Sequence, residues 1–262
     1  MRRLLLLLVS FVGLQYSFAE GRLHIDYAGD LLTEKERQQV ERMADYQIEF
    51  FRLFGLGDSL SLKITVFDEW RDSVSYIVPI QKNGNNSANK LSGVYMYNKK
   101  ELIIKGMKNN REKGLSMIYH QLSHYFTREI TGVNSPAWLI EGLGEYFKNC
   151  EVGKKGIKHS MPLYEKGRIC TMYMLGEVNL RKFVDADIFQ FMKRQKSDEK
   201  SAYILAHSVV TFMIEKVPHQ VMDDLIGLLQ NKTDRAKVSE KIARVYPGGF
   251  EAFETDFEKF CE

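Results

Sequence analysis

The feature that most constrains the fold is a helical pattern that begins near residue 110 and continues almost to the end of the chain. Apolar residues recur there every three or four positions, which is typical of amphipathic helices that pack on a shared core. The pattern predicts helices over residues 111–130, 136–148, 182–194, 200–216, 219–230, 234–244 and 248–260. The C-terminal half is therefore expected to be a set of packed helices.

The N-terminal half has a different pattern, in which apolar and polar residues alternate. Thr33, with Glu36 three positions later, is a capping-box pattern that predicts the start of a helix within this half. Residues 82–90 are polar, lack any period and predict a loop. The alternation itself predicts two strands and a hairpin, over residues 22–27, 60–67 and 93–105.

These two patterns predict an α+β protein. An α/β lobe with a small mixed sheet comes first, and a mainly helical lobe follows it. We place the junction at residues 131–136, so that the two lobes of one domain would span residues 20–131 and 132–262.

The first 19 residues have the organisation of an export signal. Basic residues precede an apolar run, and residues 17–19 (Ser-Phe-Ala) end it as a small-x-small cleavage site. The alternative is an uncleaved membrane anchor, but the run is short for a spanning helix. We therefore expect an exported protein, periplasmic or extracellular, that has no stable membrane insertion once the signal is cleaved.

Charge and cysteine content narrow the function classes. The formal net charge is +3, and removal of Arg2 and Arg3 with the signal leaves +1. Such a balance argues against a nucleic-acid groove or a polybasic membrane surface.

Three cysteines do not make a disulfide scaffold, but an exported chain could pair two of them. Cys150 with Cys170 closes the shorter loop and is the preferred pair, although spacing does not decide the pairing.

The first two helices of the C-terminal half have two distinct faces on a helical wheel. An apolar stripe lies opposite His120 and His124 in one helix, and opposite Glu141 and Glu145 in the next. These polar faces could be solvated surface, because paired glutamates are common there and two histidines four apart arise by chance. They could also line a cleft, because the surrounding positions are mostly apolar or aromatic.

A cleft would give the spacing a chemical reason. Zinc takes neutral imidazole nitrogens and carboxylate oxygens in a tetrahedral site, with water in the fourth position of a catalytic centre. His120 and His124 would supply two ligands from one helical face. Glu141 follows His124 by 17 residues across a short turn and would supply the third. Glu145, one turn later, would accept a hydrogen bond from a ligating imidazole and fix its tautomer.

These residues resemble a known family. The segments "HQLSHYF" (120–126) and "SPAWLIEGLGEYF" (135–147) are similar to the gluzincin zinc metallopeptidases, and more closely to the peptidase-MA-like proteins. Weaker similarity extends over most of the chain after residue 19. The resemblance implies a zincin-like fold with the metal helix between two lobes. It also implies zinc ligands His120, His124 and Glu141, with Glu145 as a partner outside the coordination sphere.

The chain departs from this family at Gln121, where family members have the glutamate that serves as general base. Glutamine can hydrogen-bond a water molecule but cannot accept its proton. Loss of a positioned general base typically costs about 10² to 10⁴ in rate. We do not expect Glu145 or Glu129 to replace it. The resemblance therefore implies a zinc site with weak or absent hydrolysis.

Other side chains are weaker candidates for the cleft. Tyr203 could stabilise an oxyanion, as a downstream tyrosine does in some family members, but a tyrosine in the core is the better interpretation. His207 lies one turn later and is expected to be a packing histidine. His24, His159 and His219 have no partner pattern and receive no role.

Three hypotheses for the function follow. The favoured one is an exported, zinc-binding, peptidase-like protein that is catalytically weak or inactive and binds a peptide or protein in its cleft. The hairpin at 93–105 offers an edge for an extended peptide. The second is an active zinc peptidase that tolerates Gln121. The third is a metal-free interaction or structural protein that keeps only the fold.

Overall fold

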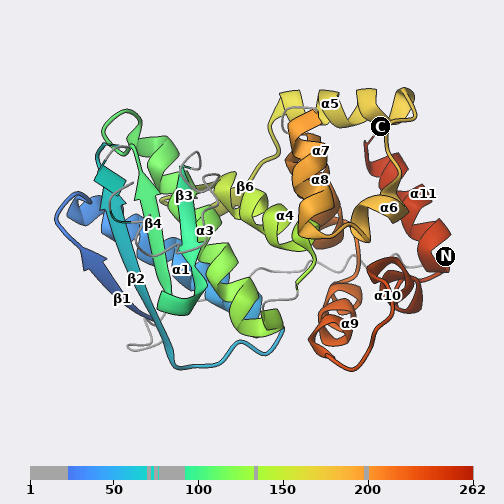
Figure 1. Ribbon diagram of the computed structural model, residues 1–262, viewed down its shortest axis with the longest axis horizontal. Coiled ribbons are helices and arrows are strands. Elements are labelled where there is room, and N and C mark those ends of the chain that lie inside the picture. The colour runs from blue at the N-terminus through green and yellow to red at the C-terminus, as the bar shows by residue number, and fades with distance from the viewer. Residues whose placement is uncertain are drawn as a thin grey trace, which may run out of the picture.

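The computed structural model of the protein (Figure 1) describes residues 23–69, 72–73, 76, 92–132, 135–197 and 201–261. The expected export signal at 1–19 and the expected polar loop at 82–90 lie outside these residues. A four-stranded sheet with helices forms the N-terminal part, and the remainder is mainly helical. The predicted α+β class is therefore confirmed.

The N-terminal sheet is mixed, as expected, with the strand order β1-β2-β4-β3. β1 and β2 are parallel, β2 and β4 are parallel, and β3 is antiparallel to β4. The predicted hairpin corresponds to β3 and β4, which makes β3 an edge strand of the sheet as far as the structure describes it. The strands span Leu23–Ala28 (β1), Leu60–Phe67 (β2), Gly93–Met96 (β3) and Glu101–Lys105 (β4).

Helices α1 (Glu34–Arg52) and α3 (Arg111–Thr131) lie behind the sheet in Figure 1 and pack on each other. α1 begins with the predicted capping box, in which the Thr33 main-chain N–H donates to Oε2 of Glu36 over 2.8 Å. The same glutamate accepts from Nε of Arg111 over 2.7 Å, so one carboxylate ties the first turns of both helices together.

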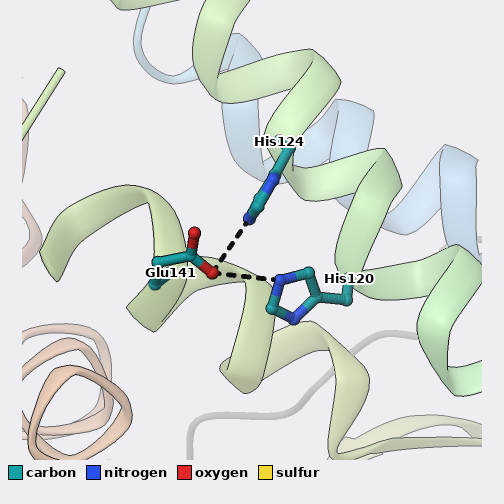
Figure 2. A group of neighbouring side chains, drawn as sticks. All are labelled: His120, His124 and Glu141. Carbon is teal, nitrogen blue, oxygen red and sulfur yellow. Dashed lines mark ion pairs between the residues drawn. The ribbon is translucent and has the colours of Figure 1, made fainter. Parts of the chain in front are cut away.

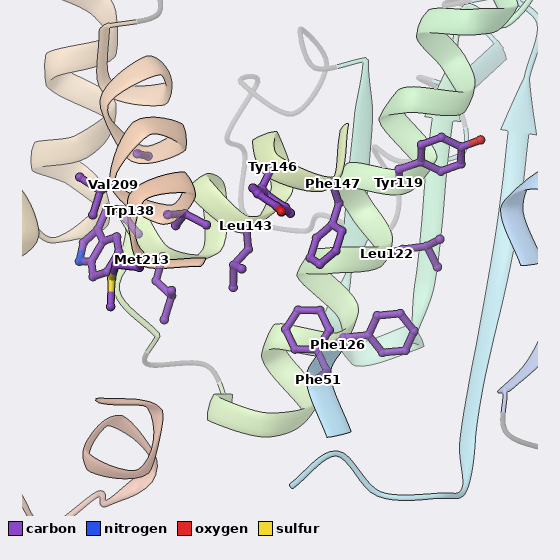
Figure 3. Packing of buried hydrophobic residues seen from close by; sticks show 14 of the residues in the cluster. Phe51, Tyr119, Leu122, Phe126, Trp138, Leu143, Tyr146, Phe147, Val209 and Met213 are labelled. Carbon is purple, nitrogen blue, oxygen red and sulfur yellow. The ribbon is translucent and has the colours of Figure 1, made fainter. Parts of the chain in front are cut away.

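Helix α4 (Ala137–Lys148) follows α3 after a short connection and packs between α3 and α8 (Ser201–Glu215). Figure 3 shows Phe126 and Phe147 beside Phe51, where α1, α3 and α4 converge. The ring of Phe51 is 5.6 Å from that of Phe126 and 5.9 Å from that of Phe147. At the other end of α4, Trp138 is fully buried against α8.

A glycine allows α4 to approach α8 closely. A Cβ atom at Gly142 would overlap the main-chain oxygen of Ala206, so no larger residue fits at this contact. The main chains of the two helices therefore set the distance between them. This contact fixes the position of the α4 face that carries Glu141 and Glu145.

The segment between α4 and α8 contains elements that the sequence pattern missed. The residues after α4 form a hairpin, β5 (Cys150–Gly153) with β6 (Gly156–His159), and then helix α5 (Leu163–Met174). α5 escaped detection because both of its ends expose apolar side chains, among them Leu163 at 84% and Met174 at 82% exposure. Its apolar residues therefore do not mark a single buried face.

The helix expected at 182–194 is two helices, α6 (Leu180–Val184) and α7 (Ile188–Ser197). The break has a local cause. The Asp187 carboxylate accepts the main-chain N–H of Gln190 over 2.8 Å and starts α7, while Asp185 accepts from Ser239. The remaining predicted helices are present and span His219–Gln230 (α9), Val238–Val245 (α10) and Gly249–Cys261 (α11). α10 begins four residues later than predicted, because the Asp234 side chain accepts the main-chain N–H of Ala236 in a turn.

The three cysteines are free thiols. Cys150 donates to the main-chain oxygen of Tyr146 over 3.4 Å, whereas the Cys170 thiol contacts the main-chain oxygen of Cys261. The preference for a Cys150–Cys170 pair was therefore wrong, because Cys170 on α5 faces α11. Among the described residues, no helix is both long and apolar enough to cross a membrane.

Candidate metal centre

Side chains from α3 and α4 converge on one point, as Figure 2 shows. Oε2 of Glu141 lies 3.3 Å from Nε2 of His120 and 3.5 Å from Nε2 of His124. These three ligand atoms all lie within 4.8 Å of one another, and no other group of three or more such residues was found in the described parts of the chain. The two predicted helical faces therefore meet, and the solvated-surface interpretation is wrong.

The convergence follows from local helix geometry and from one interhelical contact. Positions four apart lie on the same helical face, so both imidazoles point away from the sheet-facing side of α3. α4 turns back along α3 and presents Glu141 and Glu145 to those rings. All four side chains are at least 85% buried, which removes the solvated-surface explanation independently of the distances.

The charges within this group stabilise one another. Burial alone would lower the pKa of His120, but its contacts with Glu141 and Glu145 outweigh burial and raise the pKa to about 9. Burial alone would raise the pKa of Glu141, but the adjacent His124 and His120 hold that pKa far below its usual range. Without a metal, the group is thus a buried ion-pair cluster in which His120 carries the proton.

His124 behaves differently from His120. Its pKa is lowered by burial, which outweighs the attraction of Glu141, so the ring is held neutral. Its Nε2 atom is buried and has no hydrogen-bond partner. A neutral imidazole with an unpartnered nitrogen that points at a carboxylate and a second imidazole is arranged as a candidate metal ligand. The donor set, two imidazoles and one carboxylate, fits zinc, and a bound metal would replace the proton on His120.

Glu145 lies beside the ring of His120. Its Oε1 atom lies 3.2 Å from Nδ1 of His120, within ion-pair distance but without hydrogen-bond geometry. On its other side, Lys148 donates to Oε2 of Glu145 over 2.8 Å. Burial would raise the pKa of Glu145, but His120 and Lys148 lower it to about 2. The carboxylate therefore stays charged beside the ring of His120.

A second glycine on α4 leaves room for the His120 ring. A Cβ atom at Gly144 would lie 2.6 Å from Cε1 and 2.7 Å from Nε2 of His120, far inside contact distance. The imidazole thus lies against the bare main chain of α4. The two glycines in "EGLGEYF" have separate purposes, since Gly142 accommodates α8 and Gly144 accommodates a proposed ligand.

The cluster opens onto a cavity of about 290 Å³. Gln121 lies in its wall, and the side-chain oxygen of Gln121 is buried without a hydrogen-bond partner. Its amide nitrogen has only a weak contact, 3.8 Å from Sδ of Met117. The side-chain oxygen of Gln121 is therefore free to accept a hydrogen bond from a molecule in the cavity. Ser92 and Gly93, at the start of edge strand β3, also line this space.

Tyr203 packs against the core, as expected, and also lines the same cavity. It is half-buried, and its ring packs edge-on against Phe191 at 5.5 Å. Burial, together with Glu141 and Glu145, raises the pKa of the Tyr203 hydroxyl well above its usual value. The hydroxyl therefore remains protonated and can donate a hydrogen bond into the cavity.

A chain of hydrogen-bonded side chains that reaches the cavity wall at Glu165 was missed by sequence reasoning. Nδ1 of His207 is 2.6 Å from Glu165, and its Nε2 is 2.9 Å from Nε2 of His159. His159 continues the chain to Glu215 over 2.7 Å and stacks on Tyr146. His207 is thus the satisfied buried histidine that was expected.

The other residues of this hydrogen-bonded series differ from expectation. His159, which received no role, is part of the chain, and Glu165 brings it to the cavity. No sequence signal links these residues, because they come from β6, α5 and α8, and α5 itself was not predicted. Lys148 and Tyr164 also line the cavity and were missed. Tyr164 lies on the unpredicted α5, whereas Lys148 ends the predicted α4, where a terminal lysine gives no signal of a site. Glu129, by contrast, pairs with Lys100 over 3.1 Å and is absent from the cavity lining.

Comparison with known proteins adds no family assignment. No protein-family model, no curated protein and no solved structure matches the chain. The structure shows an α+β fold with a possible His-His-Glu metal-binding group at residues 120, 124 and 141.

Proposed function

We propose that this protein binds zinc through His120, His124 and Glu141 and uses the adjoining cavity to bind a peptide, with weak or absent hydrolysis. The observation that carries the proposal is the convergence of two imidazole nitrogens and one carboxylate oxygen, with Nε2 of His124 buried and unpartnered. The gluzincin-like motif supports zinc as the ion and a zincin-like fold as the scaffold. Export from the cytoplasm remains part of the proposal.

The chemistry of the cavity supports binding more than turnover. Zinc, when bound there, would polarise a carbonyl group and lower the pKa of water. The residue beside it is Gln121, which can donate and accept hydrogen bonds but cannot take up a proton at neutral pH. Tyr203 can donate a hydrogen bond to a carbonyl oxygen. The residues of this chain would thus hold an amide group without supplying the base that hydrolysis requires.

The sheet edge supports a peptide as the ligand. β3 is an edge strand in the described part of the sheet, and its first residues reach the cavity wall. An extended peptide that pairs with a strand edge gains main-chain hydrogen bonds independently of its sequence. A peptide running along β3 would pass Gly93, which lines the same cavity as His120 and Gln121.

The first test is the metal content of the purified protein after zinc reconstitution and dialysis. We expect about one zinc per chain in the parent and none in His120→Ala or His124→Ala. His24→Ala is the matched control, because His24 lies exposed on β1, away from the cavity. A parent without zinc, or equal zinc in His24→Ala and His120→Ala, would refute the metal site.

The second test restores the missing base. Gln121→Glu should raise hydrolysis of a fluorescent casein substrate by about 10² to 10⁴ over the parent, the usual contribution of a positioned general base. His124→Ala in the Gln121→Glu background should remove the gain. A parent that already cleaves casein at a rate that Gln121→Glu does not improve would show that the base is another residue.

A metal-free protein is the second candidate, and one observation favours it. The raised pKa of His120 and the lowered pKa of Glu141 show that the cluster compensates its own charges without an ion. A buried ion pair of this kind could serve the fold alone. This candidate predicts that the parent protein retains no zinc. It also predicts that His120→Ala lowers the free energy of unfolding by the same amount with and without added zinc.

A further inference from the structure

Two thiols that are remote in sequence meet at the contact between α5 and α11. Cys170 and Cys261 are 91 positions apart, and the thiol of Cys170 contacts the main-chain oxygen of Cys261. The two helices pack on each other beside this pair, and the rings of Tyr173 and Phe257 lie 5.9 Å apart at the same contact. Figure 1 shows both helices on the right-hand side of the molecule.

This contact makes the two cysteines candidates for a covalent bond. A disulfide needs Cα atoms no more than about 7 Å apart and side chains that face each other. The Cys170 thiol touches the main chain of Cys261, and Cys170 also contributes to the raised pKa of the Cys261 thiol, so the two residues are direct neighbours. A bond requires the Cys170 thiol to turn from this oxygen toward the sulfur of Cys261. A metal is the other common ligand of paired thiols, but no third ligand accompanies them in the described residues.

We propose that Cys170 and Cys261 form a disulfide that joins α5 to α11. The co-reactant is a disulfide of another thiol compound, such as oxidised glutathione or a dithiol oxidoreductase. The Cys170 thiolate attacks that disulfide, forms a mixed disulfide and releases one thiol. The Cys261 thiolate then attacks Cys170, which closes the internal bond and releases the second thiol. Two protons leave the protein, and its two electrons reduce the co-reactant to two thiols.

The burial of the two residues sets the order of these steps. Cys170 is half-buried and can be reached from solvent, whereas Cys261 is only 6% exposed. Burial, with a further contribution from Cys170, raises the pKa of the Cys261 thiol to about 12. The external reagent therefore reacts at Cys170, and Cys261 resolves the mixed disulfide from inside the protein at a rate that increases with pH.

The bond would brace one wall of the proposed binding cavity. Tyr164 and Glu165, in the first turn of α5, line that cavity, and Cys170 lies in the same helix. α5 has few buried residues of its own, namely Glu165, Ile169 and Met172. A covalent link to α11 would hold the helix in place where its packing contributes little. The inference does not depend on zinc or on a peptide ligand.

The test is to equilibrate the full-length protein with oxidised and reduced glutathione and to map its thiols by mass spectrometry after denaturation. We expect a mass lower by two hydrogen atoms, one free thiol at Cys150, and a cross-linked pair of peptides that contain Cys170 and Cys261. Cys150→Ser should retain the cross-link, whereas Cys170→Ser should lose it. Because the parent is mapped directly, the result does not depend on the folding of a variant.

The oxidised parent should also melt at a temperature higher by about 5 °C or more than the reduced parent, because the bond closes a long loop. Three free thiols at equilibrium, a cross-link to Cys150, or glutathione that remains on Cys170 without resolution by Cys261 would each refute the proposal.

Discussion

At the scale of single residues, the proposed centre depends on how His120 is held. Its Nε2 atom faces Glu141, its Nδ1 atom faces Glu145, and its ring lies on the main chain of Gly144. A ring fixed on three sides loses little rotamer freedom when a metal binds, since most of that freedom is already lost in the fold. Residues that position ligands in this way usually contribute a factor of about 10 to 100 in metal affinity.

Gly144→Ala tests this positioning. The added methyl group would overlap the His120 ring, so the ring must move away from the convergence point. We expect zinc affinity to fall by about 10-fold or more, measured by competition with a chromogenic chelator. Gly227→Ala is the matched control, because Gly227 is also inside a helix and a Cβ atom there meets nothing. Equal affinities in the two variants would show that Gly144 does not position the ligand.

At the scale of secondary-structure elements, the site depends on how α3 is anchored at its start. The guanidinium of Arg111, in the first turn of α3, pairs with Glu36 in the first turn of α1. The hydrogen bonds from Arg111, aided by the main-chain N–H of Thr33, lower the pKa of Glu36 to about 2. The capping box and the ion pair thus share one carboxylate, which fixes both helices against the sheet.

Glu36→Gln should make the protein less stable at neutral pH by about 1 to 3 kcal/mol, the usual loss for a hydrogen bond to a charged group. Because folding lowers the pKa of Glu36, its contribution is complete above the unfolded pKa and disappears as pH falls from about 4.5 to about 2. Urea unfolding at several pH values measures this. The parent and Glu36→Gln should converge in acid, whereas the exposed control Glu34→Gln should match the parent throughout.

The contact between α4 and α8 is the second anchor, and Trp138 is its largest buried side chain. Trp138→Ala should reduce the free energy of unfolding by about 3 to 5 kcal/mol, because it leaves a cavity between the helices. The indole N–H has no hydrogen-bond partner, so Trp138→Phe keeps most of the packing and removes an unsatisfied donor. A loss in Trp138→Phe as large as that in Trp138→Ala would contradict this account.

At the scale of the whole molecule, the proposed metal site joins the two parts of the chain. α3 packs on the sheet, whereas α4 packs on α8 in the helical part. His120 and His124 come from the first of these helices, and Glu141 comes from the second. An ion bound by all three would therefore cross-link the parts and would stabilise only the state in which both are folded.

The melting temperature should consequently depend on zinc. At a free zinc concentration 100 times the dissociation constant, the gain is about 2.7 kcal/mol, which corresponds to a rise of roughly 5 to 10 °C for a protein of this size. Differential scanning calorimetry with a zinc buffer measures it. His120→Ala should show no zinc-dependent rise, and a rise of the same size in that variant would place the binding elsewhere.

Much of the candidate site could be predicted because the relevant signals are local. Helical phase places His120 and His124 on one face and Glu141 on the corresponding face of the next helix, whatever the rest of the chain does. The strand alternation, the hairpin and the capping box at Thr33 are also short-range features, and each is present in the structure. Prediction failed at α5, because exposed apolar residues hide its helical period. It also failed at the break between α6 and α7, where the long-range contact of Asp185 with Ser239 interrupts the helix.

The sequence by itself determined the α+β class, the two polar helical faces and the absence of a glutamate at position 121. Each depends on residues a few positions apart, whose relative placement the backbone period fixes. Only the tertiary structure decided that the two faces meet within 3.5 Å, that Glu165 reaches the cavity with His207 behind it, and that Cys170 faces Cys261 and not Cys150. These contacts join segments far apart in the chain, and they result from the packing of whole elements, which no local pattern encodes.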